Sequence, residues 1–570
     1  MRRMIRLRTS SREGESPRLE PWISLVFVLL SAGLAVHHLS GDAATADEPV
    51  HLAAAVEIVR NGTGRWNPEH PPLAKALAGT ALAGLPIRPA DDPLRSSAGP
   101  ARLLRFLYAN ETPAGTILFR ARLPFVVLLA ALLAAVRAEA RRRWGPWAGC
   151  TALAFAALEP TLNAHAGVVH TDVAVTLFVV LSLAPLARLA RPEARYAAGL
   201  LGLLWGLAFL AKYSAPLLAF CTLPFLAADA TPSLGDLPRL ARRLLAAAGV
   251  ALLVTLAGFG WACRNQTPED RHALAVDRLE VKGRSPAAAR LALSAGDTLP
   301  PLGNLLTGTF SVALQSDVGA GVNYFLGKVS REGSPWYFPV ALAVKAPLGL
   351  LFGLGVALAA RESRRLASLL GASLLLFLLL SSRTTYNIGV RHALLFFPLA
   401  AIVAGASLAL PLGRLRRAAT LGALLVAGVE IATVHPHELS FFNALAGGPE
   451  GGRRFFVDSS LDWGQDLLRL KETAPSLAPA GLGTVVFGGD LPARHAPVLR
   501  PPLPGEEDRP GTLLAVGEAP FALGPELLRS KGAVADADRL ERIRAALRQR
   551  GRRVGAIGGS IGIWRIEPPP

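Results

Sequence analysis

The chain has 570 residues, of which 51% are hydrophobic and only 18% are charged, and its mean hydropathy is +0.37. A soluble globular domain carries about 25% charged residues, so the composition excludes an ordinary soluble protein and indicates a polytopic helical membrane protein. The net charge of +18 does not indicate a nucleic-acid-binding protein, because the basic residues form short clusters between apolar runs. That pattern is typical of cytoplasmic loops.

Eleven apolar runs have about the length that a bilayer requires. They cover residues 22–38, 115–136, 145–163, 172–188, 196–211, 213–229, 242–262, 337–359, 364–381, 391–410 and 415–434. With the N-terminal residues 1–21 in the cytoplasm, alternating sides place all six arginine-rich clusters on the cytoplasmic face. We therefore expect a multi-pass protein of the inner (cytoplasmic) membrane, with residues 22–434 as the membrane domain. The loops 39–114 and 263–336 and the tail 435–570 are expected outside the cytoplasm.

The first outer loop contains an acidic pair, Asp47 and Glu48, a few residues after the first span. Charges near a bilayer are costly unless they have a function. The same loop continues with "NPEHPPLAK", which supplies Glu69, His70 and Lys75 around two prolines that stiffen the backbone. A solvated loop explains an acidic pair alone, but acid, imidazole and cation in one loop favour a site.

The segment "EPTLNAHAGVVHTDVAV" places Asn163, His165, His170 and Asp172 where one span leaves the membrane and the next re-enters. The bland interpretation is two loop histidines near an interfacial aspartate. An ionisable residue at the mouth of a span favours a functional site instead. The spacing of His165, His170 and Asp172 does not match a tight zinc motif, so it argues against a metal.

Cations lie at the outer ends of later spans, namely Lys212, Lys345, Arg391 and the adjacent His392. Snorkelling to the interface is one explanation, and an anionic lipid headgroup or pyrophosphate-like ligand is the other. With the carboxylates and imidazoles, these cations lie on the expected outer face. The combination suits a transfer reaction in which a base deprotonates an acceptor hydroxyl while cations hold a lipid-phosphate leaving group.

The tail changes character after residue 434. Short strand-like runs such as "GTVVFGG" and "TLLAVGE" alternate with helix-like runs such as "DWGQDLLRLKETA" and "DADRLERIRAALRQRG". This alternation predicts a small extracytoplasmic α/β domain over residues 435–570. The three cysteines show no disulfide or metal spacing, so we interpret them as structural.

Several segments together resemble one family of membrane enzymes. They are "DEPVHLAAA", "NPEHPPLAKALA", "EPTLNAHAGVVHTD", "GLAFLAKYSAPLL", "VKAPLGLL", "NIGVRHALLFFP" and "DSSLDWGQDLLRL". They are similar to a bacterial branch of the GT-C glycosyltransferases, which is similar to the protein O-mannosyltransferases and the lipid A aminoarabinose transferases. The resemblance runs from about residue 40 to the final "GGSIGIWRI". It implies an all-α polytopic fold of the GT-C type.

The resemblance also implies a function, because such enzymes take a sugar from a polyprenyl-phosphate carrier on the outer membrane face. Asp47 would be the general base that deprotonates the acceptor, with inversion at the sugar, and Glu48 would be its orienting neighbour. Asp172 matches a second acidic position. The segment reads "AGVVHTD" where related sequences more often have a threonine pair before the aspartate, which leaves the role of His170 open.

The remaining candidates divide into two groups. A second site for acceptor or donor is expected from Glu69, His70, His170 and Asp172. The donor phosphate is expected at Lys75, Lys345, Arg391 and His392. The scheme requires no cofactor, and we predict no metal ligands, although some GT-C enzymes use a divalent metal.

The expected partners are a polyprenyl-phosphate-linked sugar, membrane lipids and an acceptor that is a lipid, a glycan or a protein, with no nucleic acid. A transporter or lipid flippase is the alternative function, because many spans and intramembrane cations also fit that class. Transporters usually place their sites near the midplane, often with internal repeats, and neither feature is visible here. A membrane scaffold with a partner-binding tail leaves "DE" and "EHPPLAK" unexplained.

Overall fold

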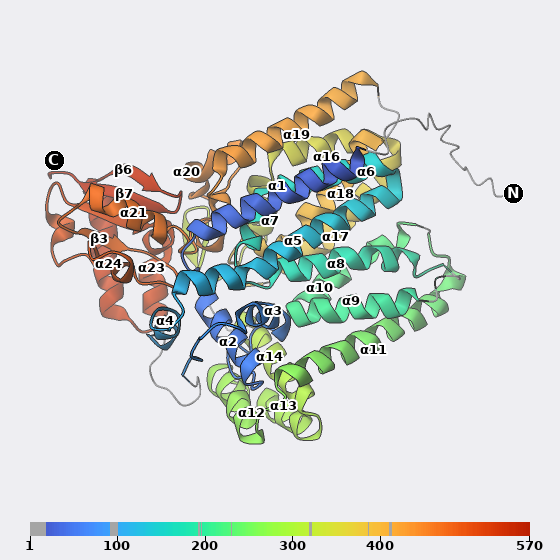
Figure 1. Cartoon of the computed structure of the whole chain (residues 1–570), viewed down its shortest axis with the longest axis horizontal. Coiled ribbons are helices and arrows are strands. Elements are labelled where there is room, and N and C mark those ends of the chain that lie inside the picture. The colour runs from blue at the N-terminus through green and yellow to red at the C-terminus, as the bar shows by residue number, and fades with distance from the viewer. Residues whose placement is uncertain are drawn as a thin grey trace.

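The computed structural model describes residues 19–91, 101–191, 194, 196–229, 231–317, 322–382, 384–385, 387–409 and 413–569. Helices dominate this part of the chain, and one five-stranded sheet lies near the C-terminus. Figure 1 shows the long helices side by side in one body, with the sheet and its helices at one end.

Five of the described helices are long and apolar enough to cross a membrane. They are α1 (Glu20–Gly41), α5 (Ala114–Trp144), α11 (Leu237–Ala262), α17 (Arg361–Ser381) and α19 (Arg414–Val434). A sixth span results if α15 (Tyr337–Lys345) and α16 (Leu348–Leu358), which meet at 98°, are counted together. The bend lies at Ala346, whose backbone is extended because Pro347 disfavours a helical residue before it. These helices make the chain a multi-pass membrane protein.

The other expected spans are shorter helices or divided ones. They are represented by α6 (Pro146–Ala157), α7 (Pro160–Ala166), α8 (Asp172–Arg188), α9 (Ala197–Ala211), α10 (Ala215–Cys221) and α18 (Phe396–Ala409). The expected span 145–163 is divided at Glu159, whose extended backbone precedes Pro160. The expected count of eleven spans is therefore not confirmed, since five described helices, or six with the bent pair, meet the length criterion. Which ends of the helices face the cytoplasm stays a prediction.

Two groups of helices outside the long spans flank the body. The first is α2 (Glu48–Arg60), α3 (Pro72–Leu82) and α4 (Ala101–Tyr108). The second is α12 (Pro268–Ala275), a π-helical turn (Val276–Lys282), α13 (Pro286–Thr298) and α14 (Pro300–Asp317), followed by the hairpin β1 (Asn323–Phe325) and β2 (Lys328–Ser330). Helices α2 and α3 approach closely at Gly79, where a Cβ would lie 2.3 Å from the Ala55 carbonyl oxygen.

The tail contains a mixed sheet with strand order β4-β3-β5-β7-β6. Its strands are β3 (Leu482–Val485), β4 (Leu499–Arg500), β5 (Leu513–Gly517), β6 (Gly551–Ile557) and β7 (Ile561–Ile566). Its helices are α20 (Gly448–Gly452), α21 (Leu467–Leu477), α22 (Pro492–His495), α23 (Glu518–Ser530) and α24 (Val534–Arg550). Strand β3 is parallel to β4 and β5, and β7 is antiparallel to β5 and β6. The tail is thus the α/β unit that its sequence pattern predicts.

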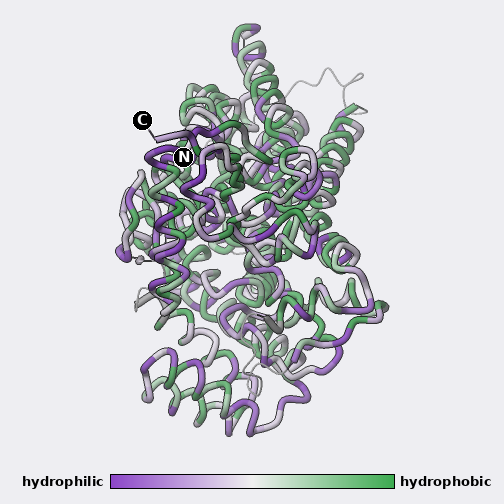
Figure 2. Tube along the Cα trace, turned by 90° about the vertical axis from the view of Figure 1, so that its left-hand side faces the viewer, coloured by the Kyte–Doolittle hydropathy of each residue, from purple (hydrophilic) through white to green (hydrophobic). Residues whose placement is uncertain are grey.

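The largest apolar core lies among the membrane helices and draws on α5, α6, α8, α16 and α18. Smaller clusters of buried residues fill the tail on the two sides of its sheet. In Figure 2, in which the tail faces the viewer, its trace alternates between hydrophilic and hydrophobic stretches. The site described below lies where the two flanking groups of helices (α2 to α4 and α12 to α14), the ends of the membrane helices and the tail meet.

Candidate active site

Asp47 lies at the turn between α1 and α2. Its backbone occupies the N-cap position of α2, but its side chain makes no capping hydrogen bond, so the carboxylate is directed elsewhere. The turn is tied to the tail, because the backbone N–H of Ala46 donates to the Trp463 carbonyl at 3.0 Å. The Asp47 side chain is 38% exposed, which leaves it accessible to a ligand.

Glu48, the next residue, is directed into the protein and is fully buried. Its carboxylate pairs with Arg122 of α5, at 2.6 Å and 2.8 Å, and accepts a hydrogen bond from the Val169 backbone N–H at 3.0 Å. Arg122 also donates to the carbonyls of Leu39, Asp42 and Ala43. Glu48 was expected as the orienting neighbour of the base, and the structure instead places it where it fixes the turn that carries Asp47.

The loop before α3 presents Glu69 and His70 to the same region. Asn67 has a left-handed backbone (φ 54°), and Lys75 donates from Nζ to the carbonyls of Asn67 and His70 at 2.9 Å and 2.7 Å. Burial lowers the pKa of Lys75 to about 8, against the opposing charge of Glu69. Lys75 was expected at the donor phosphate, but its ammonium instead binds the backbone carbonyls of the loop that carries Glu69 and His70. Glu69 pairs with Arg278.

A chain of charges crosses the site from Asp47 to Lys212. Arg391 donates to Asp47 at 3.4 Å, and its Nη1 lies 2.7 Å from Nε2 of His170. His170 Nδ1 lies 2.6 Å from Asp172, whose other oxygen accepts from Lys212 at 2.5 Å. The contact with His170 and the charge of Arg391 hold the pKa of Asp47 well below its usual range. Asp47 is therefore ionised.

Three histidines pack together beside Asp47, namely His51 of α2, His70 and His170. One ring nitrogen from each lies within 4.8 Å of the others, so this group could hold a metal ion. Burial lowers the pKa values of His51 and His70 well below the usual range, with the neighbouring imidazoles adding to the effect. His165, in contrast, contacts the Thr161 carbonyl through Nδ1 at 2.8 Å and lies outside this group.

Lys345 does not lie where the sequence placed it. It is 1% exposed, and its Nζ donates to the carbonyls of Leu439 and Ser460 at 3.1 Å and 2.7 Å and lies over the Phe442 ring. Because both of these oxygens belong to the tail, Lys345 fixes the end of α15 against the tail. Of the cations expected at the donor phosphate, Arg391 and His392 are the two that line the cavity described next.

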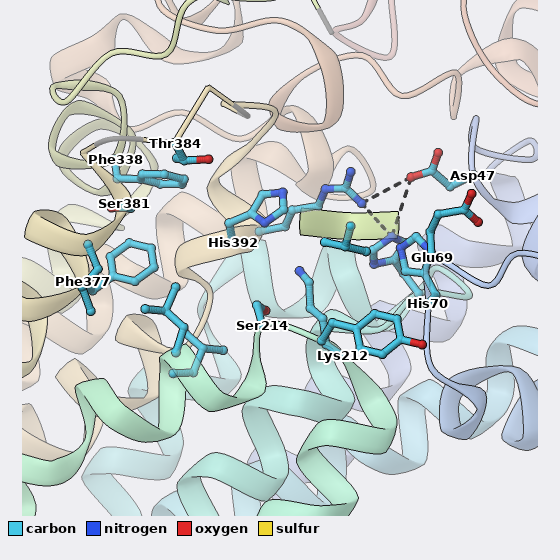
Figure 3. A pocket seen from close by; sticks show the side chains of 17 residues that line it. Asp47, Glu69, His70, Lys212, Ser214, Phe338, Phe377, Ser381, Thr384 and His392 are labelled. Carbon is cyan, nitrogen blue, oxygen red and sulfur yellow. Dashed lines mark hydrogen bonds and ion pairs between the residues drawn. The ribbon is translucent and has the colours of Figure 1, made fainter. Parts of the chain in front are cut away.

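A first cavity of about 350 Å³ opens between the flanking groups of helices and the ends of the membrane helices. Its polar side carries Asp47, Glu69, His70, His170, Lys212, Arg391 and His392. Its apolar side carries Leu217, Leu218, Val312, Phe338, Phe377 and Leu380. In Figure 3 Asp47, Glu69 and His70 lie at one end and Phe338 and Phe377 at the other, with Lys212 and His392 between them.

A second cavity of about 390 Å³ lies on the tail side of the same charges. It shares Asp47 and Arg391 with the first cavity and adds Asp458 and Lys531. The rest of its wall is mostly apolar and comes largely from the tail, with Val485, Val486, Phe487, Leu523, Leu527, Leu528 and Leu540. Asp47 and Arg391 therefore stand between two cavities of different character.

The segment 458–466 contributes to the site in a way that the sequence did not reveal. Trp463 lies under the Arg391 guanidinium at 4.5 Å, a cation–π contact that fixes this cation. Asp458 has a left-handed backbone (φ 57°), and burial raises the pKa of its carboxyl to about 6 against the charge of Arg391. The Asp462 carboxylate accepts hydrogen bonds from the backbone N–H groups of Gly464 and Ala519. The motif "DSSLDWGQDL" was visible in the sequence, but its contact partners, such as Arg391 and Ala519, lie far from it along the chain.

Residues 114–261 match the sequence profile of the family described as dolichyl-phosphate-mannose-protein mannosyltransferase. The match confirms the resemblance to protein mannosyltransferases that the sequence motifs indicate, and it indicates a glycosyltransferase. No curated protein matches the chain.

Solved structures that are similar to the chain include the following three. ArnT from Cupriavidus metallidurans, bound to undecaprenyl phosphate, is 15% identical, with 95% of this chain and 98% of that chain covered and a TM-score of 0.34. The oligosaccharyltransferase AglB from Archaeoglobus fulgidus, with an inhibitory peptide and a dolichol-phosphate, is 12% identical over 73% of this chain and 56% of that chain, with a TM-score of 0.40. The Archaeoglobus fulgidus oligosaccharyltransferase in its apo form is 11% identical over 96% and 74%, with a TM-score of 0.46.

The buried pair of Glu48 and Arg122 gives a stability prediction. Glu48→Gln leaves the Arg122 guanidinium buried without its counter-charge, so the free energy of unfolding should fall by about 3–5 kcal/mol. The double variant Glu48→Gln/Arg122→Gln removes both charges and keeps an amide donor for the backbone carbonyls, so it should lose less than the single variant. Denaturant unfolding of the purified protein in detergent measures both. A loss below about 1 kcal/mol in Glu48→Gln, the size typical of an exposed ion pair, would contradict the anchoring role.

Proposed function

We propose that this chain is an integral-membrane glycosyltransferase that moves a sugar from a polyprenyl-phosphate carrier to a hydroxyl group of an acceptor. The observation that carries the proposal is that Asp47 and Arg391 line both cavities. A base and a cation between two cavities can serve a donor on one side and an acceptor on the other. The family match to mannosyltransferases supports this class of reaction.

The first cavity suits the donor. Its apolar side, with Phe338, Phe377 and Leu380, offers a surface for an isoprenoid chain, and its polar side offers Arg391 and Lys212. Guanidinium and ammonium groups bind phosphate through charge-assisted hydrogen bonds. The lipid would enter from the membrane side of the helix ends, with its phosphate toward Arg391.

The reaction would be a single displacement. The acceptor oxygen forms a bond to the anomeric carbon as the bond from that carbon to the phosphate oxygen breaks, and the leaving electron pair stays with the lipid phosphate. Asp47 takes the hydroxyl proton, and Arg391 stabilises the charge that develops on the phosphate. One displacement inverts the configuration at the sugar. Because Arg391 now contacts Asp47 at 3.4 Å, a phosphate that takes over Arg391 would leave the Asp47 carboxylate more basic.

The second cavity suits the acceptor. Its mostly apolar wall from the tail is lined together with Asp47, Asp458 and Lys531. An acceptor that carries its hydroxyl on an apolar or lipid-like body fits this wall better than a free sugar does. We place the reaction on the outer membrane face, because the arginine-rich clusters mark the opposite ends of the membrane helices as cytoplasmic.

Asp47→Asn is expected to lower sugar transfer by about 100-fold to 10,000-fold, the usual worth of a general base, while expression and the unfolding temperature stay unchanged. The measurement is transfer to the native acceptor in membranes supplied with the lipid-linked donor. Asp297→Asn, which removes an exposed carboxylate of α13 outside both cavities, is the matched control and should keep full activity. Full activity in Asp47→Asn would contradict its role as base.

Arg391→Gln and Lys345→Met separate the two cations that the sequence placed at the donor phosphate. Arg391→Gln should weaken binding of undecaprenyl phosphate to the purified protein by about 10-fold or more, the worth of a hydrogen bond to a charged group. Lys345→Met should keep that affinity in its folded fraction and lower the unfolding temperature, because two buried carbonyls lose their donor. The reverse pattern, with affinity lost only in Lys345→Met, would move the phosphate to Lys345.

Leu527→Lys tests the acceptor side. A charge on the apolar wall should lower the amount of glycosylated product without changing undecaprenyl phosphate binding, because the two cavities have separate apolar walls. Mass spectrometry of glycans and glycolipids from a deletion strain and its parent identifies the product, and complementation with each variant then quantifies it. Leu503→Lys, an exposed leucine of the tail outside the cavity, is the control. Equal product from Leu527→Lys and the unmodified chain would contradict this acceptor path.

A further inference from the structure

Three histidine rings from separate segments meet on the wall of the first cavity. His51 lies in α2, His70 lies in the loop before α3, and His170 precedes α8. Their ring centroids are 4.7 Å, 5.1 Å and 5.6 Å apart, and one nitrogen from each ring lies within 4.8 Å of the other two. Within the residues that the structure describes, this is the one group of histidine, cysteine and acidic side chains with that spacing.

Each ring is held through its Nδ1 atom. His170 Nδ1 lies 2.6 Å from the Asp172 carboxylate, and His70 Nδ1 lies 3.0 Å from the Asn67 side-chain oxygen. Nδ1 of His51, in contrast, accepts from the Asn67 side-chain amide nitrogen at 3.4 Å. A histidine whose Nδ1 contacts a carboxylate or an amide oxygen, as in His170 and His70, is oriented to offer Nε2 as a metal ligand. For His51 to do the same, its proton has to move to Nδ1 and the Asn67 amide has to turn.

Two of the Nε2 atoms are in positions that suit a ligand. Nε2 of His51 is buried and has no hydrogen-bond partner among the described residues, which is costly for a polar atom. Nε2 of His170 faces Nη1 of Arg391 at 2.7 Å, and because a guanidinium can only donate, this nitrogen presents its lone pair. The Asp47 carboxylate lies 3.7 Å from the same nitrogen.

We propose that His51, His70 and His170 bind one divalent transition-metal ion, with Asp47 or a ligand in the cavity completing its coordination. Imidazole donors favour zinc-like ions over magnesium or calcium. In a tetrahedral zinc site, nitrogens at about 2.1 Å from the ion lie about 3.4 Å apart, so the three nitrogens, now within 4.8 Å of one another, have to move closer together. For Nε2 of His170 to bind the ion, Nη1 of Arg391 has to move away from that nitrogen.

The position of the ion matters for the cavity. It adds positive charge beside Asp47, on the wall that already carries Lys212 and Arg391, and an anion such as a phosphate would offset that charge. The metal site is close to Asp47 and Arg391 of the proposed transfer site, but it is argued from the geometry of the three rings and tested by metal binding. A failure of metal binding can therefore be distinguished from a failure of sugar transfer.

The test is metal binding by the full chain, purified in detergent with a tag that contains no histidine and then stripped with a chelator. Titration with Co²⁺ should give one equivalent per chain and the visible absorption of a tetrahedral site, and Zn²⁺ should displace it while Mg²⁺ does not. Each of His51→Ala, His70→Ala and His170→Ala should weaken Co²⁺ binding by more than about 10-fold, the loss seen even for residues behind the ligands.

His272→Ala, which removes a histidine of α12 outside the cluster, is the matched control and should bind Co²⁺ as the unmodified chain does. Asn67→Asp keeps the side chain's shape, supplies a carboxylate to the Nδ1 atoms of His51 and His70, and should tighten binding. This gain cannot come from misfolding, so it separates a true site from a damaged one. Co²⁺ binding that is equal in all three histidine variants, or an adventitious ion only, without fixed stoichiometry, would overturn the proposal.

Discussion

The ion pair between Glu48 and Arg122 is the interaction on which the site depends. Arg122 of α5 donates to Glu48 and to three backbone carbonyls at the end of α1, and Glu48 also accepts from Val169. The pair therefore joins α1, α2, α5 and the loop before α8 in a dry interior, where an unpaired charge is costly. Because the chain turns around this pair, Asp47 is left at the surface of the cavity and His170 is brought beside it.

The sequence could predict which loops carry the chemistry but not the direction of each side chain. Asp47, His70 and Arg391 were found from residue types and spacing, and all three line the first cavity. Glu48 follows Asp47 directly, yet a helical step of about 100° per residue turns it into the core. Lys75 and Lys345 have long side chains that can reach several partners. Each binds backbone carbonyls whose positions depend on the fold, and the sequence does not give those positions.

Contacts between distant segments were beyond reach of the sequence. Trp463 fixes Arg391 from the tail, and the second cavity exists because α23 and the segment 458–466 pack over the ends of the membrane helices. The three-histidine group was missed for the same reason, since its rings come from three segments and no local spacing connects them. Hydropathy located the apolar helices correctly, but prolines divide or bend some of them, as at Glu159 and Ala346.

In the proposed reaction, the donor phosphate and the base meet where the two cavities join. A cryo-EM structure of the Asp47→Asn variant with undecaprenyl phosphate tests it most directly, because this substitution should slow transfer without closing either cavity. We expect phosphate density beside Arg391 and an isoprenoid chain against Phe338 and Phe377. Phosphate density beside Lys345, or a lipid bound in the second cavity, would contradict it.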